Sequence, residues 1–180
     1  MTVRRKGSKR KSRDVYREMT VHGFALDSIA QIPLVLLKDE EGKITLPIWI
    51  NSMEAVTVAA ELINRDAIAQ SGTRDLMSLL LDQLQMSLDR ITIEGLSETR
   101  FDAFVQFARA GESIRVKVRS CDAVVMALKY SMPIQVAEDV FEQASMLDVG
   151  EEHGFGDNAA GRFVDFLESL DPKEMGKYPI

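Results

Sequence analysis

Three stretches in the N-terminal third of the chain have patterns expected of β-strands: the first alternates between apolar and polar residues, and the second is a short apolar run. The stretches cover residues 19–27, 32–39 and 44–50. Between the last two lies the sequence DEEGK, in which Gly42 can adopt the positive φ of a tight turn. We therefore expect a β-hairpin over residues 32–50. Pro47 should lie in an edge strand or at a bulge, because proline donates no ladder hydrogen bond.

The apolar spacing then changes to three and four residues, which predicts two helices. Asn51 followed by Glu54 resembles a capping box, so the first helix should span residues 52–64. Thr73 is the expected N-cap of the second helix. The apolar residues of that second helix line one face: Leu76, Met77, Leu80, Leu81 and Leu84.

Alternation returns in the second half of the chain. Two strands joined by a short turn are expected at residues 87–96 and 100–108, and a third at 114–120. They are followed by a helix at 121–130, a strand at 134–137 and a helix at 138–145. The stretch 148–161 contains four glycines and is typical of a linker, and the pattern of residues 161–170 predicts a weaker helix.

This order of elements, β-β-β-α-α-β-β-β-α-β-α, predicts an α+β fold in which helices pack on a mostly antiparallel sheet. A chain of 180 residues fits a single domain with tails. The predicted organisation is a basic disordered leader (1–18), a folded domain (19–145), a glycine-rich linker (146–160) and a C-terminal helix and tail (161–180).

Charge is distributed unevenly along the chain. Residues 1–17 contain eight Lys or Arg and one Asp, a net charge of +7, and the remaining residues carry −13 of the total of −6. Such a leader either touches an anionic surface or nucleic acid, or is simply solvated. It has no apolar segment of the kind found in secretory signals, and the chain has no apolar run of about 18 residues. With Cys121 as its one cysteine, the chain cannot form an internal disulfide, and we expect a cytoplasmic protein.

Several enzyme classes lack their motifs in this sequence. There is no P-loop, no dinucleotide-binding glycine pattern, no GxSxG and no HExxH. The two histidines, His22 and His153, have no evident nucleophilic partner. Mechanisms that depend on a serine or cysteine nucleophile beside a histidine are therefore poorly supported.

Three carboxylates fall near the predicted starts of helices: Glu54, Asp75 and Asp122. Each can serve as a cap that is favoured by the positive end of the helix dipole. If the three meet in space, their oxygens suit Mg²⁺ or Mn²⁺, which could activate water for phosphodiester cleavage. The sequence leaves both interpretations open.

Basic residues recur at every second position at the end of the strand 114–120. Arg115, Lys117 and Arg119 share one face, which could follow a phosphate backbone or could be an ordinary solvated face. Cys121 lies where a helix start and a nearby arginine lower a thiol pKa, although a small buried residue without a partner base is the alternative.

Five segments in one order resemble the bifunctional nuclease family. They are GFALDSIAQIPLVLLKDEEGKITLPIWINSMEAVTVAAEL (23–62), TRDLMSLLLDQL (73–84), ITIEGLSETRFDAFVQF (91–107), VRSCDAVVMALKYSMPIQVAEDV (118–140) and FVDFLESLDPKEM (163–175). The resemblance implies an α+β domain that self-associates and acts on DNA and RNA. Carried over by motif, the polar candidates are Glu54, Asp75, Arg119 and Asp122. Three positions depart from the family pattern: Arg74 replaces a usual histidine, Ser120 a proline and Cys121 a serine.

Two hypotheses follow. In the first, the protein is a metal-assisted phosphodiesterase with Glu54, Asp122 and Arg119 as catalytic residues, Mg²⁺ or Mn²⁺ as cofactor and Asp75 as a weak metal ligand. Arg74, Arg115 and Lys117 would then contact nucleic acid. In the second, the domain binds nucleic acid or a protein partner without cleaving it, and the same carboxylates are helix caps. Both hypotheses include a homo-oligomer.

Overall fold

The computed structural model describes residues 15–26, 32–71, 75–97 and 100–145, with only the backbone described over 63–71. Over these residues the elements follow the predicted order, so the prediction of an α+β domain with helices packed on a sheet is confirmed. The strands are β1 (Tyr16–Leu26), β2 (Pro33–Asp39), β3 (Thr45–Trp49), β4 (Ser87–Ser97), β5 (Arg100–Arg109), β6 (Glu112–Val118) and β7 (Ile134–Ala137). The helices are α1 (Ser52–Ser71), α2 (Leu76–Gln83), α3 (Ser120–Tyr130) and α4 (Glu138–Ser145).

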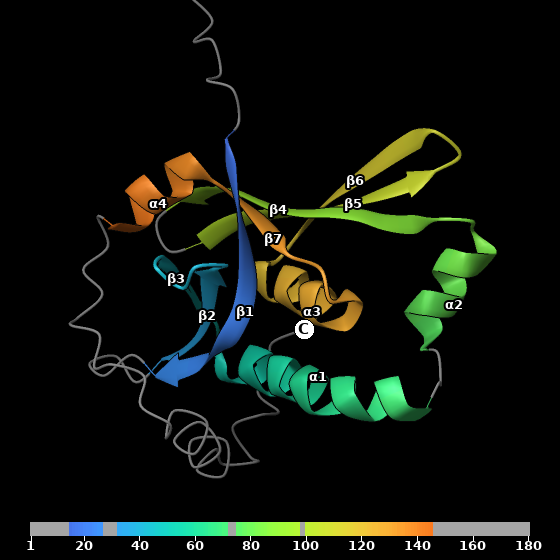
Figure 1. Ribbon diagram of the computed structural model, residues 1–180, viewed down its shortest axis with the longest axis horizontal. Coiled ribbons are helices and arrows are strands. Elements are labelled where there is room, and N and C mark those ends of the chain that lie inside the picture. Colours follow the sequence, from blue (N-terminus) through green and yellow to red (C-terminus); the bar gives the residue numbers. More distant parts are fainter. Residues whose placement is uncertain (1–14, 27–31, 72–74, 98–99, 146–180) are drawn as a thin grey trace, which may run out of the picture.

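The seven strands form one sheet in the order β3-β2-β1-β7-β4-β5-β6 (Figure 1). The pair β4–β7 is parallel and the other described pairs are antiparallel, which confirms a mostly antiparallel sheet. The parallel pair arises because α3 carries the chain from the edge strand β6 back to the middle of the sheet, and such a crossover returns a strand in the same direction.

The predicted hairpin over residues 32–50 is confirmed by the pairing of β2 with β3. Gly42 adopts a φ of 67° in its turn, which a residue with a Cβ adopts only with strain. Pro47 lies in β3, the strand at the opposite edge of the sheet from β6. This is a position where a residue without a backbone N–H is tolerated.

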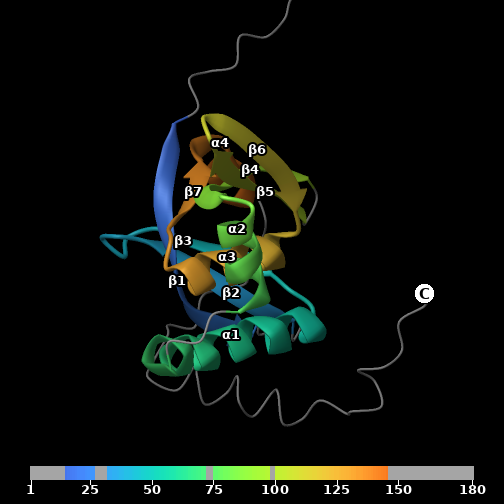
Figure 2. The same ribbon diagram turned by 90° about the vertical axis from the view of Figure 1, so that its right-hand side faces the viewer.

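Helices α1 and α3 lie beneath the sheet in Figure 1, whereas α2 lies toward its right-hand end and α4 at the upper left, and Figure 2 shows α1 and α4 at opposite ends of the molecule. Helix α3 lies against β4 and β5, and α1 packs on α3, so α3 is sandwiched between α1 and the sheet. Helix α4 packs on β4 and β7. Its buried residue Val140 belongs to the same apolar core as Val58 of α1 and Val124 of α3.

The first strand begins earlier than predicted, at Tyr16 rather than Met19. It therefore takes in Arg17, one of the basic residues of the N-terminal segment. The added residues pair with β7, and Arg17 also donates hydrogen bonds of 3.2 and 2.9 Å to Glu138 of α4. The rest of the leader, the glycine-rich segment and the predicted C-terminal helix lie outside the described residues.

The second helix differs from its prediction in two respects. Its N-cap is Asp75, whose carboxylate accepts a 3.0 Å hydrogen bond from the N–H of Ser78, so the assignment of the cap to Thr73 is wrong. Of its predicted apolar face only Leu81 is buried, against Val105 and Phe107 of β5. In the described part of the chain, no helix is long and apolar enough to cross a membrane.

Candidate active site at the start of two helices

Helix α1 begins with the predicted capping box. The side chain of Asn51 accepts a 2.9 Å hydrogen bond from the N–H of Glu54, and the Glu54 carboxylate accepts one of 3.0 Å from the N–H of Asn51. Because one oxygen of Glu54 is used in this way, the carboxylate is held at the first turn of the helix. Its other oxygen, Oε1, lies 3.7 Å from Nη1 of Arg119.

Arg119 occupies the N-cap position of α3 and joins the starts of the two helices. Its Nε and Nη2 each donate a 2.8 Å hydrogen bond to the carboxylate of Asp122, a two-pronged geometry that fixes the guanidinium plane. Arg119 makes no side-chain cap of its own helix. The hydrogen bonds and charge of Asp122, helped by the charge of Glu54 and opposed by burial, raise the Arg119 pKa further above its ordinary value.

The Glu54–Arg119–Asp122 cluster is open to solvent. The side chains of Arg119, Asp122 and Glu54 are 69%, 43% and 19% exposed. Exposed ion pairs of this kind add at most about 1 kcal/mol to stability, so the fold does not depend on them. The amino ends of α1 and α3 both point their partial positive charge here, which together with the guanidinium stabilises the carboxylates of Glu54 and Asp122.

The donor set of this cluster limits what metal it can hold. Both carboxylates contact one guanidinium, which places them within the roughly 10 Å beyond which they could not share one ion through bonds of about 2 Å. Across the described residues, no group of three or more His, Cys, Asp or Glu side chains is placed to bind a metal. An ion held by these two carboxylates would therefore need further ligands from outside the protein, such as water or a phosphate oxygen.

Asp75 does not join Glu54 and Asp122. It lies at the opposite end of α3, where Nζ of Lys129 approaches its carboxylate to 3.0 Å. Lys129 follows Asp122 by seven residues, a rise of about 10 Å along a helix. Burial raises the Asp75 pKa, but the hydrogen bonds from Ser78 and Lys129 outweigh it and leave the pKa below its ordinary value. The arrangement of all three carboxylates around one ion is therefore absent from the described residues.

The predicted basic stripe is divided and neutralised. Arg115 pairs with Glu94 at 2.6 Å and stacks on Phe104, and Lys117 pairs with Asp102. Arg119 leaves the stripe because the strand ends at Val118. These two acidic partners were not predicted from the sequence, although the alternation along β5 places Asp102 on the face that carries Lys117. Arg74 lies outside the described residues.

Cys121 is a packing residue. Its side chain is 2% exposed, and its Sγ lies 3.9 Å from the backbone oxygen of Glu54, where α3 meets α1. Burial, with the nearby charges of Glu54 and Asp122, raises the pKa of the Cys121 thiol to about 12. The thiolate needed for nucleophilic attack is therefore scarce at neutral pH. Arg119 lowers this pKa, as the sequence suggested, but burial and the two carboxylates raise it by more.

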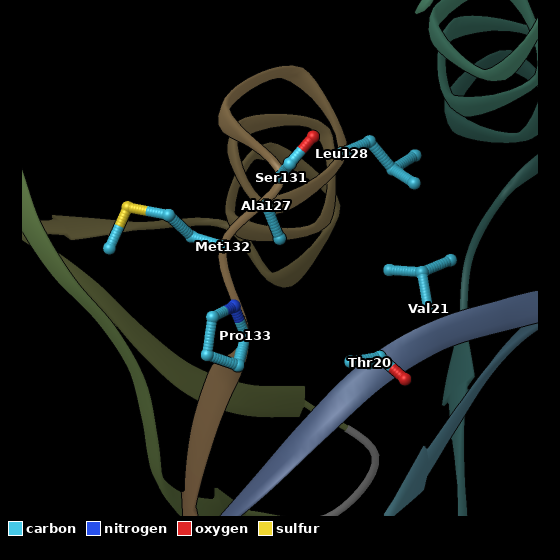
Figure 3. A pocket seen from close by; sticks show the side chains of 7 residues that line it. All are labelled: Thr20, Val21, Ala127, Leu128, Ser131, Met132 and Pro133. Atoms are coloured by element: carbon cyan, nitrogen blue, oxygen red, sulfur yellow. The ribbon is translucent and has the colours of Figure 1, made fainter. Parts of the chain in front are cut away.

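A small pocket lies at the other end of α3, between this helix and β1 (Figure 3). Its volume is about 240 Å³. It is lined by Thr20, Val21, Ala127, Leu128, Ser131, Met132 and Pro133. None of these side chains is ionisable, so the pocket offers no acid, base or charged ligand for chemistry.

Comparison with known proteins decides the family. The model of the bifunctional nuclease domain matches residues 35–148. The chain belongs to this family. Two uncharacterized proteins of Mycobacterium tuberculosis, from strains CDC 1551 / Oshkosh and ATCC 25618 / H37Rv, are each 32% identical to it over 163 residues. The alignment covers 88% of this chain and 97% of each relative. The matched bifunctional nuclease domain contains the whole Glu54–Arg119–Asp122 cluster.

Proposed function

We propose that this protein hydrolyses phosphodiester bonds in DNA and RNA at the Glu54–Arg119–Asp122 cluster. The observation that carries the proposal is an exposed guanidinium held between two carboxylates where two helix amino ends meet. Membership of the bifunctional nuclease domain family supports this choice of chemistry.

The three residues of the cluster would have different roles because they differ in charge. Arg119 is the anion-binding group, because a substrate phosphate can replace the carboxylates as the partner of its guanidinium. Asp122 and Glu54, once released, are the candidates to bind the metal ion and, through it, to orient the attacking water. Arg119 would then neutralise the negative charge that builds up on the phosphoryl oxygens in the transition state.

Mg²⁺ or Mn²⁺ is the proposed cofactor. When bound, such an ion polarises phosphoryl oxygens and lowers the pKa of water. Glu54 and Asp122 would hold it, with phosphate oxygens completing the ligand set. Asp75 is not proposed as a ligand, because it is already shared between Ser78 and Lys129.

A cleavage assay tests the proposal. The chain, purified free of other nucleases, is incubated with single- and double-stranded DNA and RNA and with Mg²⁺ or Mn²⁺. Asp122→Asn and Glu54→Gln should each lower the rate by about 100-fold or more, the usual contribution of a positioned acid or base. Matched controls are Asp139→Asn, an exposed carboxylate in the first turn of α4, and Glu41→Gln in the β2–β3 turn. Cleavage that survives both site substitutions refutes the assignment.

A non-catalytic binding module is the second candidate. The observation in its favour is that Arg115, Lys117 and Arg119 are all engaged in ion pairs, which weakens their pull on a phosphate backbone. In that case nucleic acid binds without being cut, and Asp122→Asn leaves binding intact or tightens it.

We further propose that the protein works as a homo-oligomer in the cytoplasm. The cytoplasmic location is proposed because its one cysteine is free and buried.

A further inference from the structure

The single tryptophan of the chain lies close to the start of α1. Trp49 is the last residue of the edge strand β3, and two residues later Asn51 exchanges hydrogen bonds with Glu54 in the capping box. Two residues span at most about 7 Å along an extended chain. The backbone of Trp49 is therefore held within about 7 Å of the residue that fixes the Glu54 carboxylate.

The indole ring of Trp49 is stacked on the ring of Phe101 in β5. The two ring centroids are 6.3 Å apart and the planes differ by 14°. Ala103, two residues after Phe101, lies opposite Val118 in the sheet, and Arg119 follows Val118 directly. The stacked pair is thus connected through β3 to the start of α1, and through β5 and β6 to the start of α3.

The two stacked rings differ in burial. Phe101 is 7% exposed, whereas Trp49 is partly exposed although Ile48 beside it is completely buried. Tryptophans are often incompletely buried because they are large, so exposure alone assigns no role. What distinguishes Trp49 is its place between the starts of the two helices that carry the candidate site. The buried ring of Phe101 also fixes the plane of the indole, which lowers the cost of ordering it when another flat ring binds.

We propose that Trp49 stacks on an unpaired nucleobase of the substrate while Arg119 binds a phosphate of the same strand. This inference rests on the proposed function and narrows its substrate to single-stranded DNA or RNA in preference to a duplex. A base inside a duplex is stacked and paired, and it must leave the helix before a side chain can stack on it. Stacking uses the flat face that every base has, so Trp49 would favour no particular sequence.

Tryptophan fluorescence tests the inference directly, because Trp49 is the one tryptophan of the chain. The full chain is titrated in EDTA, so that metal-assisted cleavage does not consume the strand, and tryptophan alone is excited. A short oligothymidylate should quench the emission. A strand of the same length without bases, and a duplex of oligothymidylate with its complement, should leave the emission nearly unchanged.

Substitution of Trp49 separates stacking from packing. Trp49→Leu should raise the dissociation constant of the labelled oligothymidylate by about 10-fold or more, within the usual contribution of one base–aromatic stack. It should leave that of the strand without bases within about twofold, because the phosphate contacts remain. Trp49→Phe keeps an aromatic ring and should recover most of the affinity. Fluorescence anisotropy of the labelled strands measures these values, and circular dichroism confirms folding.

The matched control is Tyr130→Leu, which removes a partly buried aromatic ring at the opposite end of α3. It should bind both strands as the wild type does. Binding of oligothymidylate without a change in emission overturns the inference. Equal weakening of both strands in Trp49→Leu also overturns it, because the tryptophan then acts through packing.

A cleavage assay separates this inference from the proposed function. If Trp49→Leu cuts single strands with the KM and kcat of the wild type, the stacking role is refuted and the proposed hydrolysis stands. If oligothymidylate quenches the emission of a wild type that cuts no strand when Mg²⁺ or Mn²⁺ is added, the stacking role stands and the proposed hydrolysis is refuted.

Discussion

The two ends of α3 carry the same kind of contact with opposite consequences. At the amino end, Arg119 binds Asp122 and reaches Glu54 at the start of α1. At the carboxyl end, Lys129 binds Asp75 at the start of α2. Each end thus ties α3 to the first turn of another helix through a cation and a carboxylate.

Exposure and the number of other partners separate the two ends. The Lys129 side chain is 21% exposed, and Asp75 also accepts hydrogen bonds from the N–H and the hydroxyl of Ser78. This contact therefore has a structural role, as the cap of α2 and its link to α3. Arg119 is 69% exposed, and Asp122 and Glu54 contact different nitrogens of its guanidinium. A cation–carboxylate pair becomes a candidate for chemistry when water and substrate can reach it and when the fold survives its loss.

Substitutions at the two ends of α3 should differ most in their effect on the cleavage rate. Arg119→Met should lower the rate constant for phosphodiester hydrolysis by about 100-fold or more, because it removes the group that offsets developing charge. Lys129→Met, the matched change at the other end of the helix, should leave the rate within about threefold. The measurement is a single-turnover rate on a labelled oligonucleotide, and equal losses in both variants would show that the contrast has no functional meaning.

Stability should respond in the opposite order. Asp75→Ala removes a helix cap together with an ion pair, and it should lower the free energy of unfolding by about 1–2 kcal/mol. Arg119→Met should cost less than about 1 kcal/mol, because its pairs are exposed. Urea denaturation of the two variants measures both values. A larger loss for Arg119→Met would make the amino-end cluster structural.

The pH dependence of stability sharpens the same distinction. The pKa of Asp75 is below its ordinary value of 3.8 in the folded protein. At pH values between the folded-state and unfolded-state pKa, the unfolded state binds more protons, so the stability of the fold falls as pH falls through this range. Asp75→Asn keeps a good cap and removes the charge. The stability advantage of the wild type over this variant should be complete above about pH 5 and shrink as pH drops below 3.8. An advantage independent of pH would contradict a charge effect.

The smallest expected effect concerns Cys121, which lies next to the exposed cluster and is itself buried. Since burial raises its pKa to about 12, iodoacetamide should label the native thiol far more slowly than the unfolded one at pH 8. Cys121→Ser restores the residue of the family pattern and should change the cleavage rate by less than about threefold. Rapid labelling of the folded protein would show that the start of α3 opens.

The hydrophobic pattern by itself determined the order of the elements. Each strand or helix buries one face, so its apolar residues recur with the period of that element. The capping box of Asn51 and Glu54 and the turn at Gly42 were equally local, and both could be predicted. The family resemblance supplied Glu54, Arg119 and Asp122 as candidates.

Only the tertiary structure decided which charged residues meet. Packing of α1 on α3 brings Glu54 to Arg119, whereas packing of α2 on β5 takes Asp75 to Lys129. The ends of β4 and β5 supply Glu94 and Asp102 to the basic strand, and the same packing leaves the leucines of α2 uncovered. These contacts join residues far apart in the chain, and local periodicity contains no information about them because each depends on how whole elements are placed against one another.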